Sequence, residues 1–193
     1  MYREHSQVVF PEFQNTHVNM MPIIFGDLDS VPKHLRRYGS MIEQCDLKPG
    51  TTVYLTVDEK FLNEGDFLRR PGIHTDGTNA LGWGGGWGYQ EGIYLASNDG
   101  RCKVWDSITH NVDHLGGLLG NPEGDEVELK PNTMYWITDR TPHESLSVEK
   151  TGVRQFFRLV SDGIGAWFAQ HSTPNPLGVE PMAPIVNYDK FEA

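Results

Sequence analysis

The sequence predicts a mainly β protein, built as an antiparallel sandwich or jelly roll with a few flanking helices. After Gly50 there are about eight short stretches with the composition of β-strands in roughly a hundred residues, separated by turn signals. No helical stretch between them is long enough for the crossover connections of a parallel sheet. Neighbouring strands are therefore expected to run antiparallel, in packed layers.

These strands follow one another at short intervals. Asn98-Asp99-Gly100 indicates a tight turn between the third and the fourth of them, and Pro131-Asn132 and residues 150–152 would serve similarly between later pairs. The strands are expected at residues 51–57, 72–77, 92–96, 101–106, 126–129, 133–138, 143–147 and 153–160.

The two ends of the chain predict flanking helices. The first part of the sequence is a lead-in to one helix over residues 30–45, because Ser30 is a good N-cap and apolar residues then recur at helical spacing. Pro32 is tolerated in a first turn. Residues 163–171 predict a short helix, followed by an extended tail that completes the C-terminal segment, 163–193. We expect the whole chain, 1–193, to form a single domain with its core strands at about 51–160.

Composition limits the function. With 193 residues and a hydrophobic fraction of 38%, the chain can form a packed core. A net charge of −10 argues against nucleic acid as a partner and leaves small-molecule substrates open. Cys45 and Cys102 fit buried thiols in a reducing compartment. No stretch approaches a membrane span and the N-terminus lacks an apolar signal region, so we expect a cytoplasmic protein without a membrane partner. The oligomeric state stays open.

The pattern His74-Thr75-Asp76 is the strongest chemical signal. In an extended strand, residues two apart point to the same face, so the imidazole of His74 and the carboxylate of Asp76 would lie side by side. His143, much later in the chain, completes the set if the fold returns it to this place. Two imidazoles and one carboxylate on one face of a metal leave open positions opposite, which suits a non-haem Fe(II) oxygenase. We expect these three residues to bind the metal and form the catalytic centre.

Arginines surround this pattern in the sequence. Arg154 and Arg158 share one face of the last expected strand, with Phe156 between them. Burying an unpaired guanidinium is costly, so these two arginines predict an anionic partner. Arg69 and Arg70 are further candidates for contact with an anionic substrate, although an exposed basic pair would explain them as well.

Residues 81–89 are rich in glycine and tryptophan and directly follow the His-Thr-Asp strand. Glycines make the backbone permissive and indoles offer flat apolar surfaces. One interpretation is a mobile loop over the metal site, in which Trp83 and Trp87 contact the substrate. The alternative is that the tryptophans only plug one end of the sandwich.

A His-x-Asp pair, a long interval, a second histidine and then an arginine form a recognisable order. In this respect the chain resembles the Fe(II)/2-oxoglutarate-dependent oxygenases of the cupin-like superfamily. The likeness covers about residues 51–160 and implies a double-stranded β-helix. It also implies Fe(II) bound by His74, Asp76 and His143, with 2-oxoglutarate and O2 as co-substrates.

The resemblance extends to individual roles. It implies that Arg154 holds the far carboxylate of 2-oxoglutarate; Arg158 could do so instead, or reach an anionic group of the substrate. Tyr54 is a candidate for a hydrogen bond to 2-oxoglutarate, although a core position is the alternative. Asp76 occupies the position that halide takes in related halogenases. A carboxylate there favours hydroxylation or desaturation, of a small polar metabolite.

Two other functions remain open. A cupin-type metal enzyme, such as a cofactor-free dioxygenase or an isomerase, would usually carry a close His-x-His pair and a glutamate. A non-catalytic jelly-roll module would bind a sugar or a protein through Trp83 and Trp87. His110 and His114 could form a second metal pair, but the neighbouring Gly116 indicates a loop with solvated histidines.

Overall fold

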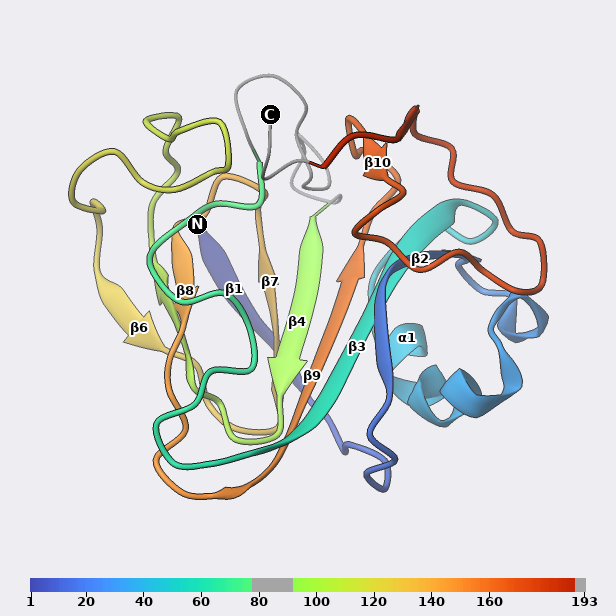
Figure 1. The fold of residues 1–193 in the computed structure, drawn as a ribbon, viewed down its shortest axis with the longest axis horizontal. Helices are drawn as coiled ribbons and strands as arrows, with labels where there is room; N and C mark the ends of the chain where they lie inside the picture. The colour runs from blue at the N-terminus through green and yellow to red at the C-terminus, as the bar shows by residue number, and fades with distance from the viewer. Residues whose placement is uncertain (78–91, 190–193) are drawn as a thin grey trace.

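Most of the strands form two antiparallel sheets that face each other in a sandwich-like arrangement (Figure 1), and the two last strands form a small separate sheet. The computed structural model describes residues 1–77 and 92–189. The larger sheet has the order β1 (Tyr2–Gln7), β7 (Thr133–Ile137), β4 (Ile93–Ser97), β9 (Gly152–Val160), β3 (Thr52–Leu62), β2 (His17–Ile24). The smaller has the order β6 (Glu126–Glu128), β5 (Cys102–Trp105), β8 (His143–Ser145). The mainly β, antiparallel prediction is confirmed.

From β4 onward the chain passes repeatedly between the two sheets. It leaves the larger sheet after β4 and enters the smaller one at β5, and it changes sheet again between β6 and β7, between β7 and β8, and between β8 and β9. The turn expected at residues 98–100 is present, but it joins strands of different sheets and not a hairpin. Gly100 has a φ of +74°, and a Cβ there would lie 2.5 Å from the Leu129 carbonyl oxygen, so this crossing requires glycine.

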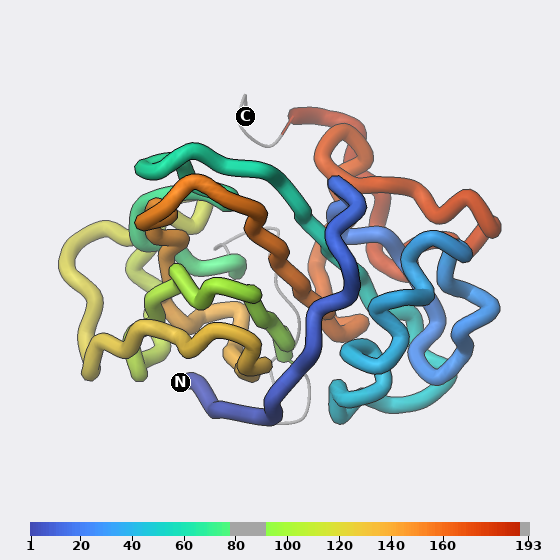
Figure 2. The backbone as a smooth tube through the Cα atoms, turned by 90° about the horizontal axis from the view of Figure 1, so that it is seen from below, coloured from blue at the N-terminus to red at the C-terminus, as the bar shows by residue number. Residues whose placement is uncertain are grey.

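The larger sheet separates two hydrophobic cores. Along β9, Phe157 and Leu159 pack toward the helical segment, because successive residues of a strand face opposite sides. Phe156 and Val160 pack in the other core, between the two sheets, which is called the interior core below. Viewed from below, the helical segment lies to one side of the sandwich (Figure 2). Arg154 and Arg158 are each two residues from Phe156, so they lie on the same face of β9 and point into the space between the sheets.

The N-terminal region differs from the expectation. Two strands, β1 and β2, precede the helical segment and form both edges of the larger sheet. β1 is mostly polar and incompletely buried, and β2 contains Pro22 and a register shift between Val18 and Met21, so neither shows a regular strand pattern. The helix expected over 30–45 is three short pieces: η1 (Leu28–Ser30), η2 (Lys33–Tyr38) and α1 (Gly39–Glu43). Pro32 lacks the amide that a continuous helix needs.

Two further local predictions are wrong. Residues 72–77 form no regular strand; only an isolated bridge at His74 pairs them with other segments. The helix expected over 163–171 is absent. Instead, β10 (Trp167–Phe168) pairs in parallel with β11 (Ile185–Val186), because two adjacent aromatic residues are buried against the interior core and Gly163 and Gly165 disfavour a helix.

Glu59 on β3 holds the helical segment against the larger sheet. Its carboxylate accepts hydrogen bonds from Arg37 Nη1 at 2.9 Å, Tyr38 Oη at 2.6 Å and Gln155 Nε2 at 2.9 Å. Burial by itself raises the pKa of Glu59, but the hydrogen bonds from Arg37 and Tyr38 outweigh it and lower the pKa to about 2.

Since the folded-state pKa lies below the ordinary value of 4.5, Glu59 stabilises the fold above that pH and loses this contribution as the pH falls toward 2. We expect Glu59→Gln to lower the free energy of unfolding at pH 7 by about 3 kcal/mol. It should also weaken the loss of stability between pH 5 and pH 2. Urea unfolding at pH 5 and at the acid end of this range measures the change in the free energy of unfolding. The control is Glu43→Gln, which alters an exposed carboxylate. Equal acid sensitivity in Glu59→Gln and the unaltered chain would contradict the assignment.

Candidate metal centre

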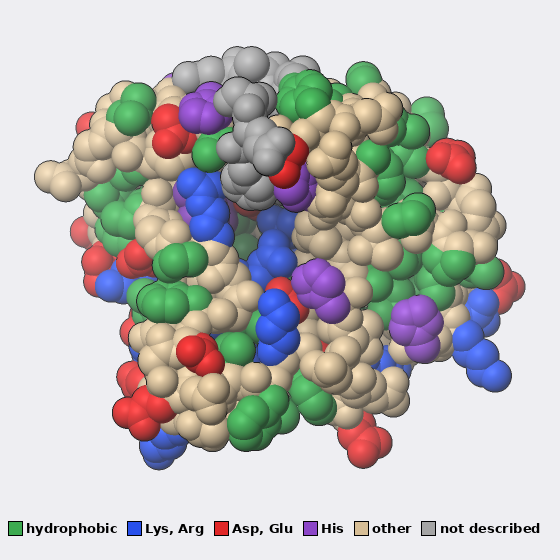
Figure 3. Space-filling model, viewed as in Figure 1, with side chains coloured by type: hydrophobic (Ala, Val, Ile, Leu, Met, Phe, Trp, Pro, Cys, Tyr) green, Lys and Arg blue, Asp and Glu red, His purple; other side chains and the backbone are tan. Residues whose placement is uncertain are grey.

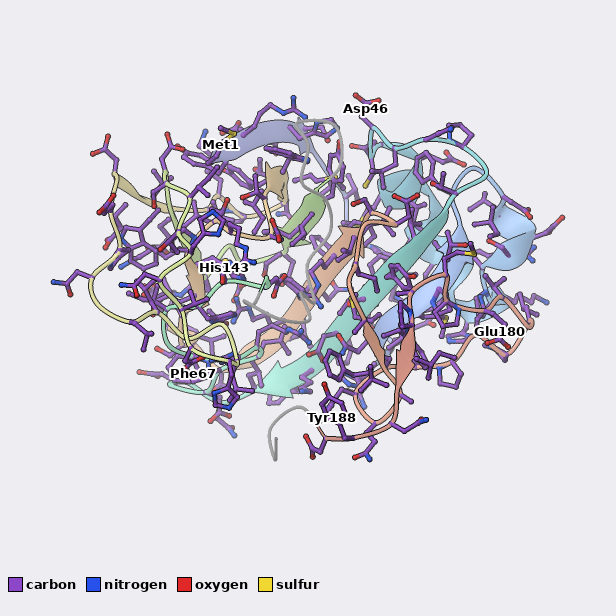
Figure 4. All side chains as sticks on the ribbon, turned by 90° about the horizontal axis from the view of Figure 1, so that it is seen from above. Met1, Asp46, Phe67, His143, Glu180 and Tyr188 are labelled. Carbon is purple, nitrogen blue, oxygen red and sulfur yellow. The ribbon has the colours of Figure 1, made fainter. Side chains whose placement is uncertain are left out.

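His74, Asp76 and His143 come together between the two sheets. One ligand atom from each lies within 4.8 Å of the other two. Asp76 and His143 are each 9% exposed, and His74 is half-buried. Seen from above, His143 lies on the opposite side of the picture from Glu180 and the helical segment (Figure 4). Within residues 1–77 and 92–189, this is the only such group of three potential ligands.

Backbone pairing places the two histidines side by side. The amide of His74 donates to the carbonyl of His143 at 3.0 Å, and the amide of His143 donates to the carbonyl of His74 at 2.9 Å. Residues that exchange both hydrogen bonds in an antiparallel pair present their side chains on the same face. The two imidazole centroids are accordingly 4.5 Å apart.

The segment around Asp76 is held on both sides although it forms no strand. The amide of Thr75 donates to the carbonyl of Gly116 at 2.8 Å, and the amide of Gly77 donates to the carbonyl of Asp139 at 2.7 Å. Gly116 has a φ of +83°, and a Cβ there would lie 2.3 Å from the Thr75 carbonyl oxygen. This close approach requires glycine and keeps His74 and Asp76 facing the same space.

Both imidazoles are oriented by a second hydrogen bond. His74 Nδ1 lies 2.7 Å from the Gly72 carbonyl oxygen, and His143 Nδ1 lies 2.9 Å from the Thr141 carbonyl oxygen. A carbonyl accepts only, so each Nδ1 carries the proton and each Nε2 keeps its lone pair for a metal. This pairing of a ligand imidazole with an outer acceptor is typical of metal sites.

The protonation states fit metal binding. Burial, and then the neighbouring His143, lower the pKa of His74 to about 3, so its imidazole is neutral at pH 7. Burial by itself would raise the pKa of Asp76, but Arg158 and the two histidines hold that pKa well below its usual range. A neutral imidazole and an ionised carboxylate are the forms that bind metal ions.

Arg158 fixes the carboxylate of Asp76. Its Nη1 donates to Asp76 Oδ2 at 2.9 Å, and the other oxygen, Oδ1, lies 3.9 Å from His143 Nε2. One carboxylate oxygen is thus occupied by the guanidinium and the other faces the histidines. Arg158 is 5% exposed, and its Nε has no hydrogen-bond partner among the described residues.

Arg154, in contrast, has protein acceptors on all three nitrogens. Nε pairs with Asp99 Oδ1 at 3.0 Å, Nη1 donates to Ser145 Oγ at 3.2 Å, and Nη2 donates to the Arg101 carbonyl at 2.7 Å. Arg154 is 1% exposed. In this structure the anionic partner that the sequence demands for Arg154 is Asp99, from the turn after β4, and no donor is left for 2-oxoglutarate.

The other candidates are dispersed. Tyr54 is completely buried in the interior core, and its hydroxyl accepts from the Ala183 amide at 3.3 Å, as a core residue would. Arg70 is exposed and donates to the Leu115 carbonyl at 2.9 Å. His110 and His114 do not join the ligand group. Trp83 and Trp87, with the whole 81–89 segment, lie outside the described residues. No described helix is long and apolar enough to cross a membrane.

Sequence reasoning did not find Asp58. This carboxylate lies on β3 within a run of buried residues, and its side chain is 2% exposed. Its signal is an acidic residue that directly follows the apolar and threonine residues 52–57 of the strand, on the inward-facing side, where a carboxylate must have a cationic partner. The strand expected at 51–57 ended one residue too early to include it.

No protein-family model matches this chain, and no curated protein matches it either.

Proposed function

We propose that this protein is an Fe(II)- and 2-oxoglutarate-dependent dioxygenase that hydroxylates, or otherwise oxidises, a C–H bond of a small polar metabolite in the cytoplasm. The observation that carries the proposal is the convergence of His74, Asp76 and His143, with both Nε2 lone pairs and one carboxylate oxygen directed to one place. Two histidines and one carboxylate leave open positions on a metal, and this donor set is characteristic of non-haem Fe(II) oxygenases.

The strand arrangement supports the same proposal. Strands that alternate between two facing antiparallel sheets are what a jelly roll, and its double-stranded β-helix variant, requires. In this arrangement β8, β9 and the segment around His74 all border the space between the two sheets, so their inward-facing side chains meet there.

The protein residues would perform distinct tasks. His74, Asp76 and His143 would hold Fe(II), which together with 2-oxoglutarate and O2 supplies the oxidising power for the C–H bond. Gly72 and Thr141 carbonyls keep the imidazoles in the correct tautomer. Arg158 keeps the carboxylate of Asp76 ionised and oriented. The interior core excludes water from one side of the site.

Arg158 is the better candidate for the far carboxylate of 2-oxoglutarate, since its Nε is free of described partners and Arg154 is occupied. Arg158→Lys keeps a positive charge but loses the guanidinium fork. We expect it to raise the 2-oxoglutarate concentration for half-maximal turnover at least about tenfold while metal content stays near that of the unaltered protein. Initial rates of succinate release measure this. If Arg154→Lys, at native stability, has this effect and Arg158→Lys does not, the two roles must be exchanged.

The function itself is tested by succinate release. Anaerobically purified protein, loaded with Fe(II), should convert 2-oxoglutarate to succinate only when O2 is present, faster with the correct substrate, and the product should carry oxygen and no halogen. All three nitrogens of Arg154 already have acceptors in the protein, so this arginine is not available for 2-oxoglutarate. This observation favours one alternative, a cupin-type metal enzyme that needs no 2-oxoglutarate. Stoichiometric metal binding without any binding of 2-oxoglutarate would replace the proposed function by that alternative.

A further inference from the structure

A second cluster of charge lies beside the metal centre and has no role in holding it. Asp58 faces the space between the sheets and contacts three cationic or potentially cationic side chains. His17 Nδ1 lies 2.9 Å, Lys60 Nζ 3.5 Å and Arg69 Nη1 3.4 Å from its carboxylate oxygens. The side chains of these three are exposed by 56%, 45% and 28% respectively, so ligands from solvent reach them.

The cluster is continuous with the candidate metal centre. Asp58 pairs across the sheet with Phe156, and Thr56 pairs with Arg158, two residues further along β9. Because Arg158 contacts Asp76, the carboxylates of Asp58 and Asp76 lie at neighbouring places between the sheets. Burial and the neighbouring Arg158 lower the pKa of Arg69, while Asp58 and Asp76 oppose this change. Figure 3 shows basic side chains gathered in the middle of one face, next to a histidine and an acidic side chain.

The guanidinium of Arg69 is held in place, but not all of its hydrogen-bond donors have partners among the described residues. Its guanidinium lies over the ring of Phe156, with Cζ 5.4 Å from the ring centroid, which restrains it through a cation–π contact. Its hydrogen bond to a described residue is the long one to Asp58 through Nη1. No hydrogen bond joins Nε or Nη2 to any residue of the described ranges 1–77 and 92–189, so within these ranges the positioned guanidinium offers a pair of donors, the arrangement that binds carboxylates and phosphates in a bidentate way.

Charge around the site is in excess on the positive side. Asp76 is matched by Arg158, which leaves Asp58 alone opposite both Arg69 and Lys60, without counting His17. A divalent metal adds two more positive charges, and a 2-oxoglutarate dianion would remove only those two. The positive charge that remains on Arg69 and Lys60 favours a further anionic group at this cluster.

We propose that Arg69 and Lys60 form an anion subsite that binds the carboxylate or phosphate group of the substrate, a role that rests on the oxygenase function proposed above. The substrate is then a small anionic molecule. Its charged group lies over β3 and β9 at Asp58, which orients the guanidinium of Arg69, and its reactive carbon extends toward His74, Asp76 and His143.

The test is calorimetric titration of the full chain, loaded with Zn(II) and 2-oxoglutarate so that the open positions of the metal are filled. Inorganic phosphate and acetate are titrated separately. We expect saturable binding of at least one probe, weakened at least about tenfold by Arg69→Gln. Arg36→Gln, which removes an exposed arginine on η2 paired with Asp29, is the matched control and should change binding less than about twofold.

The probe that binds identifies the group: phosphate binding lost in Arg69→Gln assigns a phosphate, and acetate binding lost assigns a carboxylate. If Arg69→Gln does not fold by circular dichroism, Lys60→Gln, whose ammonium is half-exposed, should still weaken binding about threefold. No saturable binding of either probe, or equal weakening by Arg36→Gln, overturns the subsite. If 2-oxoglutarate does not bind but phosphate binding depends on Arg69, the subsite stands and the oxygenase function fails.

Discussion

Replacing His143 by alanine is expected to remove metal binding and turnover together. In the proposed site the imidazole would supply one of three protein ligands, and His74 and Asp76 alone would form only a two-point contact. Loss of one ligand from a set of three should reduce the metal content of purified protein from about one ion per chain to a trace. Elemental analysis after dialysis against excess metal measures this directly, and succinate release measures turnover.

His114→Ala is the matched control for this change. His114 is exposed and lies outside the ligand group, so the variant should bind as much metal as the unaltered protein. Circular dichroism of both variants separates metal loss from unfolding. Unchanged metal content in His143→Ala would rule out the triad as the metal site.

Arg154→Ala should unfold the protein more readily than any other single change to the arginines. The substitution leaves Asp99 without its cation and removes the donors that serve the Ser145 hydroxyl and the Arg101 and Leu146 carbonyls. Breaking a buried ion pair by removal of one partner costs about 3–5 kcal/mol. We expect a decrease of this size in the free energy of unfolding, measured by urea titration at pH 7.

Asp99→Asn provides the comparison on the other side of this ion pair. The side chain of Asp99 is 30% exposed, and the amide oxygen can still accept from Arg154, so we expect a loss of only about 1 kcal/mol. A different result would assign Arg154 to catalysis. If Arg154→Ala retained native stability but lost 2-oxoglutarate binding, 2-oxoglutarate would replace Asp99 as the partner of Arg154. Arg154 would then bind the far carboxylate of 2-oxoglutarate, as the resemblance implied.

The central strands were predictable from local pattern. β4, β5, β7 and β9 are runs of mainly β-branched and aromatic residues between turn signals, and each lies close to its expected position. β3 begins where it was expected but continues to Leu62, beyond the predicted end at residue 57, through the charged residues 58–60. β1 and β2 were not predictable in this way. Both are edge strands, whose geometry depends on the partner they pair with, and β2 is also interrupted by a bulge near Met20, which has a φ of 49°.

The candidate metal ligands were only partly predictable from the sequence, for a similar reason. The spacing of His74 and Asp76 is a local signal, whereas the meeting with His143 depends on the paired amides and carbonyls of two distant segments. The expected regular strand is absent, yet both side chains reach the same space because Gly116 and Asp139 hold the segment from either side. A local pattern thus named the residues, and non-local hydrogen bonds gave them their positions.

The sequence by itself determined that this chain is mainly β, that Arg154 and Arg158 share an inward face, and which three residues are able to bind a metal together. Only the tertiary structure decided what each arginine contacts: Asp99 and carbonyl groups for Arg154, Asp76 for Arg158, and Asp58 for Arg69. Periodicity reports the side of a strand on which a residue lies. The acceptor that neutralises a buried cation comes from elsewhere in the chain, because an inward charge requires a partner wherever the fold can supply one.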